Sequence, residues 1–240
     1  MRILILQNDP ITPAGIVAER IAARPGTTAV VVHPHSGDSL PDAADGFAAA
    51  VVLGGPMSAT DEARYPAIAP MLDLLRDFHR QDRPLLGLCL GAQLLARSFG
   101  KSVRRHTALE FGFVPIEITE EGARDPLLAD LPRRQRIMQW HEDTFDMPDE
   151  GVRLMTGDAC INQAFRVGRA TYGFQCHFEV TPALVNTWLD GFGHSLAGHL
   201  GEAAVPAAIR RVREETAAYA DAARAFAEAV SDRWLDLAVR

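Results

Sequence analysis

The chain has 240 residues, of which 48% are hydrophobic and 23% charged, and its formal net charge is −7. These proportions are typical of a globular protein, and the acidic balance argues against a nucleic-acid partner or an anionic membrane surface. Cys89, Cys160 and Cys176 lack the spacing of a disulfide framework or zinc site, and no apolar stretch approaches the ~20 residues of a membrane span, so we expect a cytoplasmic protein.

The first hundred residues predict strands that alternate with helices. Short apolar runs predict strands over residues 2–6, 28–33, 49–53 and 85–88. Apolar positions three and four residues apart predict helices over residues 12–24 and 68–78. Because the strand cores are apolar on both faces, the pattern indicates a parallel sheet covered by helices on each side. We therefore expect a three-layer, flavodoxin-like α/β fold with an open, mostly parallel sheet and a ligand at the carboxyl ends of its strands.

Residues 84–93 have the pattern of a nucleophile elbow, a sharp strand-to-helix turn that exposes one reactive side chain. The apolar run ends in Gly-x-Cys-x-Gly, centred on Cys89, and a helical pattern follows from Gln93. Glycine is expected on both sides because a side chain would clash in so tight a turn. A helix N-terminus also lowers the pKa of a thiol. Cys89 is therefore a candidate nucleophile; the alternative is a small buried hydrophobic residue.

After residue 100 the predicted strands become shorter and partly antiparallel. They lie at Val103 and over residues 111–118, 136–140 and 152–155, followed by a hairpin of residues 164–167 and 170–175 that closes at Gly168. We expect these strands to form a small antiparallel addition to the sheet.

The C-terminal part is predicted to be helical. One helix begins at Pro182, with Thr181 as its N-cap, and an alanine-rich helix covers about 203–238. The alanine-rich helix carries one apolar stripe, formed by Ile209, Val212, Tyr219, Phe226, Val230, Trp234 and Leu237. We expect the stripe to dock against its own domain; a homodimer or partner-protein surface is the alternative. Because no linker divides the chain, we expect a single domain over residues 1–240, with a catalytic core over about 40–185 and a C-terminal helical extension over about 182–240.

A candidate base for the cysteine follows the predicted strand over residues 170–175. If this loop lies beside the elbow, His177 can take the proton of Cys89, and Glu179 can bond the other ring nitrogen. The alternatives are a structural histidine and a surface carboxylate or helix cap.

A glycine pair, Gly54 and Gly55, follows another predicted strand. Bare backbone N–H groups there, with the amide of Leu90, can form an oxyanion hole for a tetrahedral intermediate. The alternative is a plain glycine-proline turn.

Together these segments resemble the class I glutamine amidotransferases, glutaminase domains with a Cys-His-Glu triad. The family patterns Gly-Gly-Pro-x-Ser, Gly-x-Cys-x-Gly-x-Gln and Gln-x-His-x-Glu stand here at residues 54–58, 87–93 and 175–179, in family order. The resemblance covers about 40–185. Residues 139–145 and 158–165 also resemble segments of stand-alone members.

The resemblance implies a role for each matching position. The nucleophile is Cys89, the base and acid is His177, and the residue that orients the histidine is Glu179. The amides of Gly55 and Leu90 contact the oxyanion. The glutamine moiety is held by Gly54, Gln93, His141, Glu142 and Asp143. No cofactor or metal is implied, and the sequence shows no candidate cluster for one.

Four positions depart from the family pattern. Ala92 replaces a histidine, as it does in stand-alone members, and Cys176 replaces a phenylalanine and is expected to pack inside. Phe178 replaces a proline and is expected to loosen the loop. Glu142 replaces a glycine, and this change is the most serious. A bulky anion in the substrate-facing loop either repels the carboxylate of a free amino acid or favours its amine.

We therefore expect thiol-dependent hydrolysis of the side-chain amide of glutamine or a γ-glutamyl compound, through a thioester on Cys89. Because no second catalytic domain fits after residue 185, the enzyme is either free-standing, as a γ-glutamyl peptidase would be, or a glutaminase subunit that passes ammonia to a separate synthetase. The Trp-His-x-Asp-Thr-Phe segment favours the free-standing enzyme. A third hypothesis is a non-catalytic binding or regulatory module, and a fourth is cysteine-based redox or chaperone-like chemistry.

Overall fold

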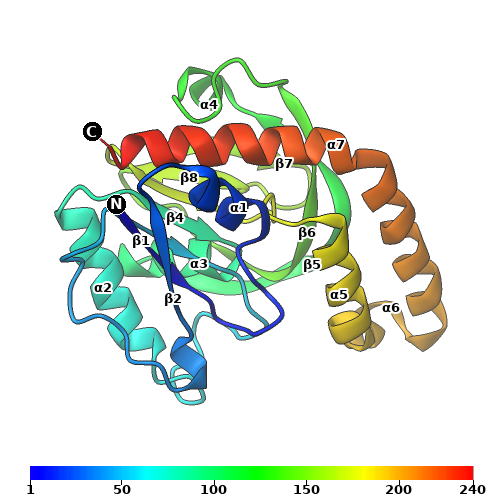
Figure 1. Ribbon diagram of the computed structural model, residues 1–240. Helices are drawn as coiled ribbons and strands as arrows, with labels where there is room; N and C mark the ends of the chain where they lie inside the picture. The colour runs from blue at the N-terminus through cyan, green and yellow to red at the C-terminus, as the bar shows by residue number, and fades with distance from the viewer. Residues whose placement is uncertain (240) are drawn as a thin grey trace.

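One continuous β-sheet runs through the protein (Figure 1). The computed structural model describes residues 1–239, and within them the sheet has nine strands in the order β2-β1-β3-β4-β9-β8-β7-β5-β6. The parallel strands are β1 (Arg2–Leu6), β2 (Thr28–Val32), β3 (Ala49–Val52), β4 (Leu85–Leu88) and β9 (Thr171–Phe174). The antiparallel strands are β5 (Val103–Ile118), β6 (Arg134–Phe145), β7 (Val152–Gly157) and β8 (Ala164–Val167). The predicted α/β sheet is confirmed, and its antiparallel strands continue the parallel sheet directly.

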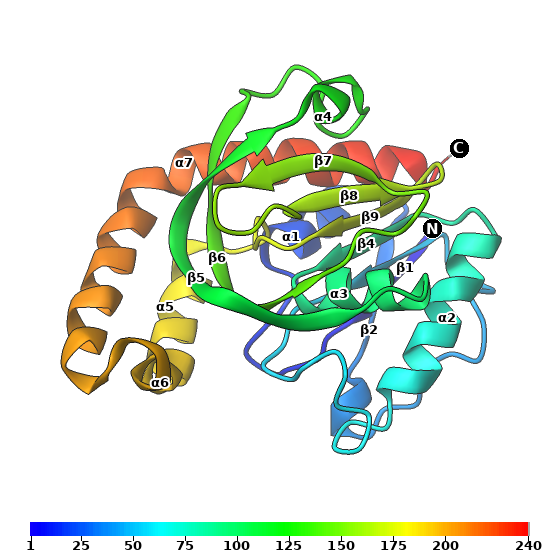
Figure 2. The ribbon, with the colours of Figure 1, turned by 180° about the vertical axis from the view of Figure 1, so that it is seen from behind.

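Helices cover both faces of the parallel strands (Figures 1 and 2). One face packs against α1 (Gly15–Ala23) and α7 (Val205–Leu237), and the other against α2 (Ile68–Arg80) and α3 (Leu90–Ser98). Successive side chains of a strand point to opposite faces, so β1 contributes to both cores. Ile3 and Ile5 pack in the core that contains α1 and α7, whereas Leu4 and Leu6 pack with α2 and α3. The predicted three-layer arrangement is confirmed.

The antiparallel part is larger than predicted. β5 and β6 are long, and Figure 2 shows them curving around the molecule beside the parallel strands. Their register shifts between Arg105 and Glu110. Residues 104–107 are polar, so no apolar alternation indicates a strand there. Pairing with β6 extends the strand through this polar segment.

The C-terminal helices begin where the sequence predicted. α5 (Pro182–Phe192) is capped by Thr181, whose hydroxyl accepts a hydrogen bond from the Leu184 N–H at 3.2 Å. Short helices then lead to α7, namely η2 (Gly193–Leu196), α6 (Ala197–Leu200) and η3 (Glu202–Ala204). These three short helices were not predicted, and neither were η1 (Pro34–Ser36) and α4 (Glu120–Arg124).

The apolar stripe of α7 docks against its own domain, as expected. Phe226, Val230 and Trp234 are buried in the core that contains α1 and the sheet, and Figure 1 shows the second half of α7 lying across that face. An ion pair between Arg20 of α1 and Asp232 of α7, at 2.8 Å, lies beside this apolar contact.

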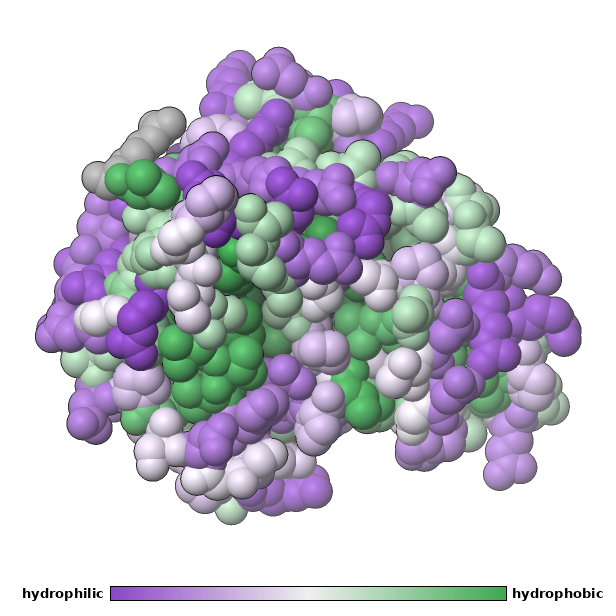
Figure 3. Space-filling model, in the orientation of Figure 1, coloured by the Kyte–Doolittle hydropathy of each residue, from purple (hydrophilic) through white to green (hydrophobic). Residues whose placement is uncertain are grey.

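The surface is mixed in polarity. Figure 3 shows an apolar area over β2, the edge strand of the sheet, where Val31 is 45% exposed. Among residues 1–239, we find no helix with the length and hydrophobicity needed to cross a membrane.

Candidate active site

Cys89 occupies the turn between β4 and α3. β4 ends at Leu88, α3 begins at Leu90, and Cys89 between them has a φ of +50° and a ψ of −106°. A positive φ is uncommon outside glycine, and strained backbone of this kind concentrates at functional sites. The Cys89 N–H donates to the carbonyl of Phe174 in β9 at 2.8 Å, which ties the turn to the neighbouring strand. The predicted elbow is present.

The elbow requires glycine on both sides. A Cβ on Gly91 would lie 2.0 Å from the carbonyl oxygen of Val52, and a Cβ on Gly87 would lie 2.6 Å from the backbone of Gly91. Neither contact is sterically allowed, so α3 can approach β3 and β4 this closely only without side chains at these positions.

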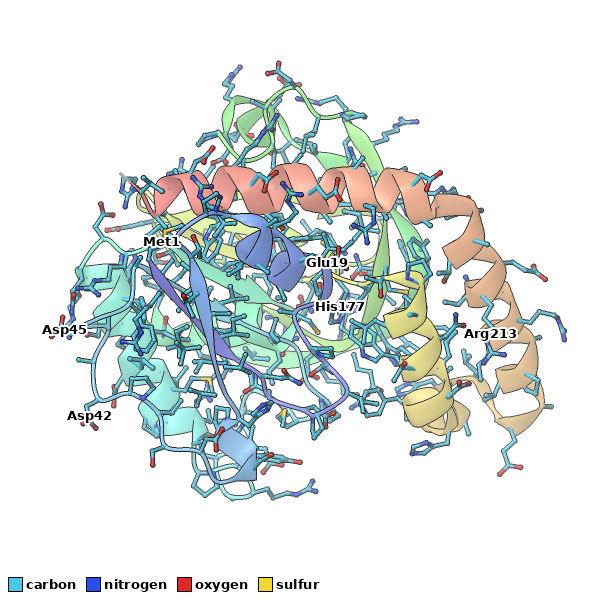
Figure 4. The ribbon with its side chains drawn as sticks, in the orientation of Figure 1. Met1, Glu19, Asp42, Asp45, His177 and Arg213 are labelled. Atoms are coloured by element: carbon cyan, nitrogen blue, oxygen red, sulfur yellow. The ribbon has the colours of Figure 1, made fainter. Side chains whose placement is uncertain are left out.

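His177 and Glu179 lie in the loop between β9 and α5, and both side chains are buried. Nδ1 of His177 is 2.8 Å from Oε1 of Glu179. The backbone N–H of His177 donates to the carbonyl of Met138 in β6 at 2.8 Å. The ring of His177 packs edge-on against Trp188 of α5, with centroids 4.8 Å apart. Figure 4 shows His177 in the middle of the molecule. Because Nδ1 is held by the carboxylate, Nε2 is the ring nitrogen left for another partner.

Cys89 and the ring of His177 flank the same glycine. A Cβ on Gly54 would lie 2.9 Å from Cε1 of His177 and 3.6 Å from Cβ of Cys89. Burial lowers the pKa of His177, but the charge of Glu179 and the charge and hydrogen bond of Cys89 outweigh it and raise that pKa to about 10. A donor also faces the sulfur, since Nε2 of Gln175 is 3.6 Å from Sγ. The fold thus brings thiol, imidazole and carboxylate together.

A cavity of about 540 Å³ opens beside Cys89, within the size range of small-molecule sites. The predicted site residues that line it are Gly55, Cys89, Leu90, Gln93, His141, Glu142, Asp143 and His177. Leu90 is the first residue of α3, so its N–H has no acceptor inside the helix. Gly54 and Glu179 do not line the cavity but contact His177 directly behind it.

The polar residues expected to hold the substrate are largely engaged with one another. Both ring nitrogens of His141 have protein partners, Oε2 of Glu110 at 2.9 Å and the carbonyl of Asp143 at 3.0 Å. Nε2 of Gln93 lies 3.4 Å from the same Asp143 carbonyl and 3.2 Å from Oε1 of Gln175. His141 therefore has no ring nitrogen left for a substrate. Its interactions and those of Gln93 position the wall of the cavity.

Glu142 is not the isolated anion that the sequence suggested. Its carboxylate forms an ion pair with Arg105 of β5 and also lies 2.7 Å from Nε2 of His199 in α6. Arg105 balances its charge at the cavity wall, and the contact with His199 connects β6 to the C-terminal helices. Neither repulsion of a carboxylate nor attraction of an amine follows from Glu142 alone.

Three residues of metal-ligand type meet beside this wall. Glu110, His141 and Cys160 place their ligand atoms within 4.8 Å of one another, which sequence analysis missed because they are distant in the chain. The group is already hydrogen-bonded, and Gln163 donates to Oε2 of Glu110 at 2.7 Å. Burial raises the pKa of the Cys160 thiol, whereas metal binding requires a thiolate. The donor set fits a structural hydrogen-bond network better than a metal site.

Sequence analysis also missed the residues that close the cavity from outside the motifs. They are Thr12, Arg105, Trp188, Gly191, Phe192, His194 and Ser195. No motif marks them. The helix predicted from Pro182 was the available signal, because a helix that starts so soon after Glu179 must pack near it.

The two remaining departures from the pattern that were expected to affect packing are both buried. Phe178 contacts Phe174 and Phe226 with ring centroids 5.0 and 5.9 Å away. The ring therefore anchors the loop, where loosening was expected. Cys176 packs inside as expected, and burial raises the pKa of its thiol.

Comparison with known proteins agrees with this architecture. The family model described as glutamine amidotransferase class-I matches residues 16–193. The glutamine amidotransferase-like protein YfeJ of Salmonella typhimurium is 30% identical over 205 residues, which cover 84% of this chain and 85% of that protein. A crystal structure of a glutamine amidotransferase from Thermotoga maritima superimposes with a TM-score of 0.87 at 25% identity and covers 98% of both chains.

Relatives of a second kind match over shorter regions. One subunit of the glutamine-hydrolysing GMP synthase of Pyrococcus abyssi is 35% identical over 109 residues, which cover 45% of this chain and 56% of that subunit. The glutamine-hydrolysing GMP synthase of Christiangramia forsetii is 27% identical over 144 residues, only 26% of its length.

Proposed function

The chain belongs to the class I glutamine amidotransferase family, and on this basis we propose that it hydrolyses the side-chain amide of glutamine or a γ-glutamyl compound with Cys89 as nucleophile. One observation carries the proposal. A cysteine on a strained elbow and a histidine held by a buried glutamate flank a single glycine beside a cavity.

The first half of the reaction forms a thioester. A cysteine reacts as its thiolate, and the raised pKa of His177 allows the imidazole to hold the proton that Cys89 gives up. The sulfur of Cys89 bonds to the γ-carbonyl carbon, and the carbonyl oxygen takes the negative charge. We assign the stabilisation of that oxyanion to the amides of Gly55 and Leu90. The C–N bond then breaks as His177 gives its proton to the leaving ammonia or amine.

The second half regenerates the enzyme. His177, now neutral, accepts a proton from water, and the resulting hydroxide adds to the thioester carbon. The C–S bond breaks, glutamate leaves, and the cysteine returns as a thiolate beside the imidazolium. Glu179 holds the imidazole in the orientation that both halves need.

We further propose that the enzyme is free-standing and that the chain acts as one unit. Residues from α5 and η2 line the cavity, and the stripe of α7 is covered by its own domain. The likeness to one subunit of a GMP synthase supports a different arrangement, a glutaminase subunit that passes ammonia to a synthetase. Turnover by the purified chain alone supports the free-standing enzyme. Covalent labelling of Cys89 without turnover supports dependence on a partner.

The direct test measures ammonia or amine release from glutamine, γ-glutamyl dipeptides and glutathione. Cys89→Ser is expected to lower the rate by at least about 10³-fold, as loss of a triad member does elsewhere. Cys176→Ala, a change at another buried cysteine, is the matched control and should keep its activity. If Cys89 is not labelled by diazo-oxonorleucine, a glutamine analogue, and the wild type releases nothing from these compounds, the hydrolase hypothesis is rejected in favour of a non-catalytic binding module.

A further inference from the structure

The loop after β3 leaves little room for a side chain at either of its two glycines. A Cβ on Gly54 would lie 2.9 Å from the ring of His177, and a Cβ on Gly55 would lie 2.6 Å from Sδ of Met57. Glycine solves this steric problem, but it also gives the loop more conformational freedom than any other residue would. The orientation of the Gly54–Gly55 peptide must therefore be fixed by contacts from elsewhere.

Two side chains that follow β1 supply such contacts. Nδ2 of Asn8 donates to the carbonyl of Leu53 at 2.8 Å. The hydroxyl of Thr12 lies between two carbonyls, that of Gly54 at 3.2 Å and that of Asp9 at 3.1 Å, so its one proton is shared between the glycine pair and the loop after β1. Both side chains are buried. In a planar trans peptide the C=O and the next N–H point in opposite directions. Holding the carbonyls of Leu53 and Gly54 therefore also fixes where the N–H groups of Gly54 and Gly55 point.

The segment that carries the two anchors is itself held in place. The Gln7 N–H donates to the carbonyl of Val32 at 2.9 Å. Further along, Nε1 of Trp188 donates to the carbonyl of Ile11 at 2.6 Å, and the Ile16 N–H donates to the carbonyl of Glu179 at 2.8 Å. The loop between β1 and α1 thus contacts the glycine pair and the helix beside His177, and the first turn of α1 contacts the backbone of Glu179.

From these contacts we propose that Asn8 and Thr12 are positioning residues, which keep the Gly55 N–H turned toward the oxyanion formed on Cys89. This inference rests on the proposed hydrolysis and adds residues that lie before every motif of the site. An oxyanion hole is effective because its donors are already aimed before charge develops. Loss of an anchor should therefore slow the chemical step and leave substrate binding intact.

The kinetic test uses variants that differ in one polar group. Thr12→Val removes the hydroxyl at nearly constant shape, Thr12→Ser restores it, and Asn8→Ala removes the amide. Thr12→Val and Asn8→Ala should each lower kcat by at least about 10-fold, less than the loss of an oxyanion donor itself, with KM changed less than about threefold. Thr12→Ser should retain most of the wild-type kcat. Thr216→Val, which removes a buried hydroxyl bonded only within α7, is the matched control and should match the wild type.

Two further measurements separate positioning from general damage. Alkylation of Cys89 by iodoacetamide needs no oxyanion hole, so its rate should stay within about twofold in Thr12→Val. In a crystal structure of Thr12→Val, the Gly54–Gly55 peptide should be turned relative to the wild type. An unchanged peptide, an unchanged kcat, or equal losses in kcat and alkylation would overturn the proposal.

The structural measurement also distinguishes this proposal from the function on which it rests. If the wild type releases nothing from any γ-glutamyl compound, the hydrolase assignment fails. The orientation of the Gly54–Gly55 peptide in Thr12→Val then tests the anchoring role by itself. A turned peptide then still supports the anchoring role, and an unturned one rejects it.

Discussion

Replacing Glu179 by glutamine should move the alkaline limit of activity toward neutral pH. The substitution keeps the size of the side chain and an oxygen that can accept from Nδ1 of His177, but it removes the negative charge 2.8 Å from the ring. Burial lowers the pKa of His177, and the charge of Glu179, together with Cys89, raises it by more. The raised pKa keeps the imidazolium protonated up to about pH 10, and above this the proton needed by the leaving amine is lost.

The size of the shift follows from the geometry. Both charges are spread over several atoms, so their centres lie farther apart than the 2.8 Å between Nδ1 and Oε1. Two unit charges about 4 Å apart interact by about 4 kcal/mol at an effective dielectric constant of about 20. Since about 1.4 kcal/mol corresponds to one pH unit, removal of the carboxylate should lower the pKa of His177 by roughly three units, from about 10 to near 7. The alkaline limb of kcat/KM should move by the same amount.

Two measurements check this prediction. The pH dependence of kcat/KM reports the groups that titrate in the free enzyme, and NMR of the ring protons follows His177 directly. Glu121→Gln, a change at an exposed glutamate of α4, is the control and should leave the profile unchanged. An alkaline limb and a ring titration that stay in place in Glu179→Gln would refute the assignment of the raised pKa to this carboxylate.

Three further substitutions test the packing and the cavity wall. Gly91→Ala would place a Cβ 2.0 Å from a backbone oxygen of β3, so urea unfolding should show a loss of at least about 3 kcal/mol, whereas Gly198→Ala in open space should not destabilise. Trp234→Ala empties a fully buried site under α7 and should cost about 3–5 kcal/mol in the same assay. Glu142→Gln frees Arg105 at the cavity wall; it should change stability by less than about 1 kcal/mol and lower KM for anionic γ-glutamyl substrates, an effect that added salt should weaken.

The parallel half of the fold was predictable because each signal in it is local. The strand over 85–88 is a short apolar run, and its end is marked by a glycine pattern that only one kind of turn needs. The N-terminus of α5 was equally clear, because Thr181 and Pro182 form a cap that depends on adjacent residues alone.

The antiparallel half was predicted less completely because its outer strands depend on partners distant in sequence. Arg104 and Arg105 continue β5 by pairing with Thr144 and Asp143 of β6. Polar side chains on a strand edge produce no apolar alternation, so neither the length of β5 nor its register shift was visible from the sequence. Pairing, and not local propensity, determines the strand here.

In the site, too, some residues are marked by local sequence patterns and others depend on packing between distant elements. The motifs identified the side chains proposed to carry the chemistry, because Gly-x-Cys-x-Gly and His-x-Glu keep their residues close together in sequence. The supporting residues come from elsewhere. Trp188 and Arg105 reach the cavity from α5 and β5, and Thr12 from the loop after β1. Their positions follow from the packing of complete elements, which no short pattern encodes.

The two buried histidine–glutamate pairs of this protein differ in the hydrogen bonds that their imidazole rings make. His141 contacts Oε2 of Glu110 through Nε2 and the carbonyl of Asp143 through Nδ1, so both ring nitrogens have protein partners and neither is left for a substrate or a thiol. His177 bonds its carboxylate through Nδ1 alone, and its Nε2 is left for the neighbouring thiol of Cys89. Residue type and burial are the same in both pairs. The unengaged nitrogen is what makes one histidine a candidate base and the other part of the cavity wall.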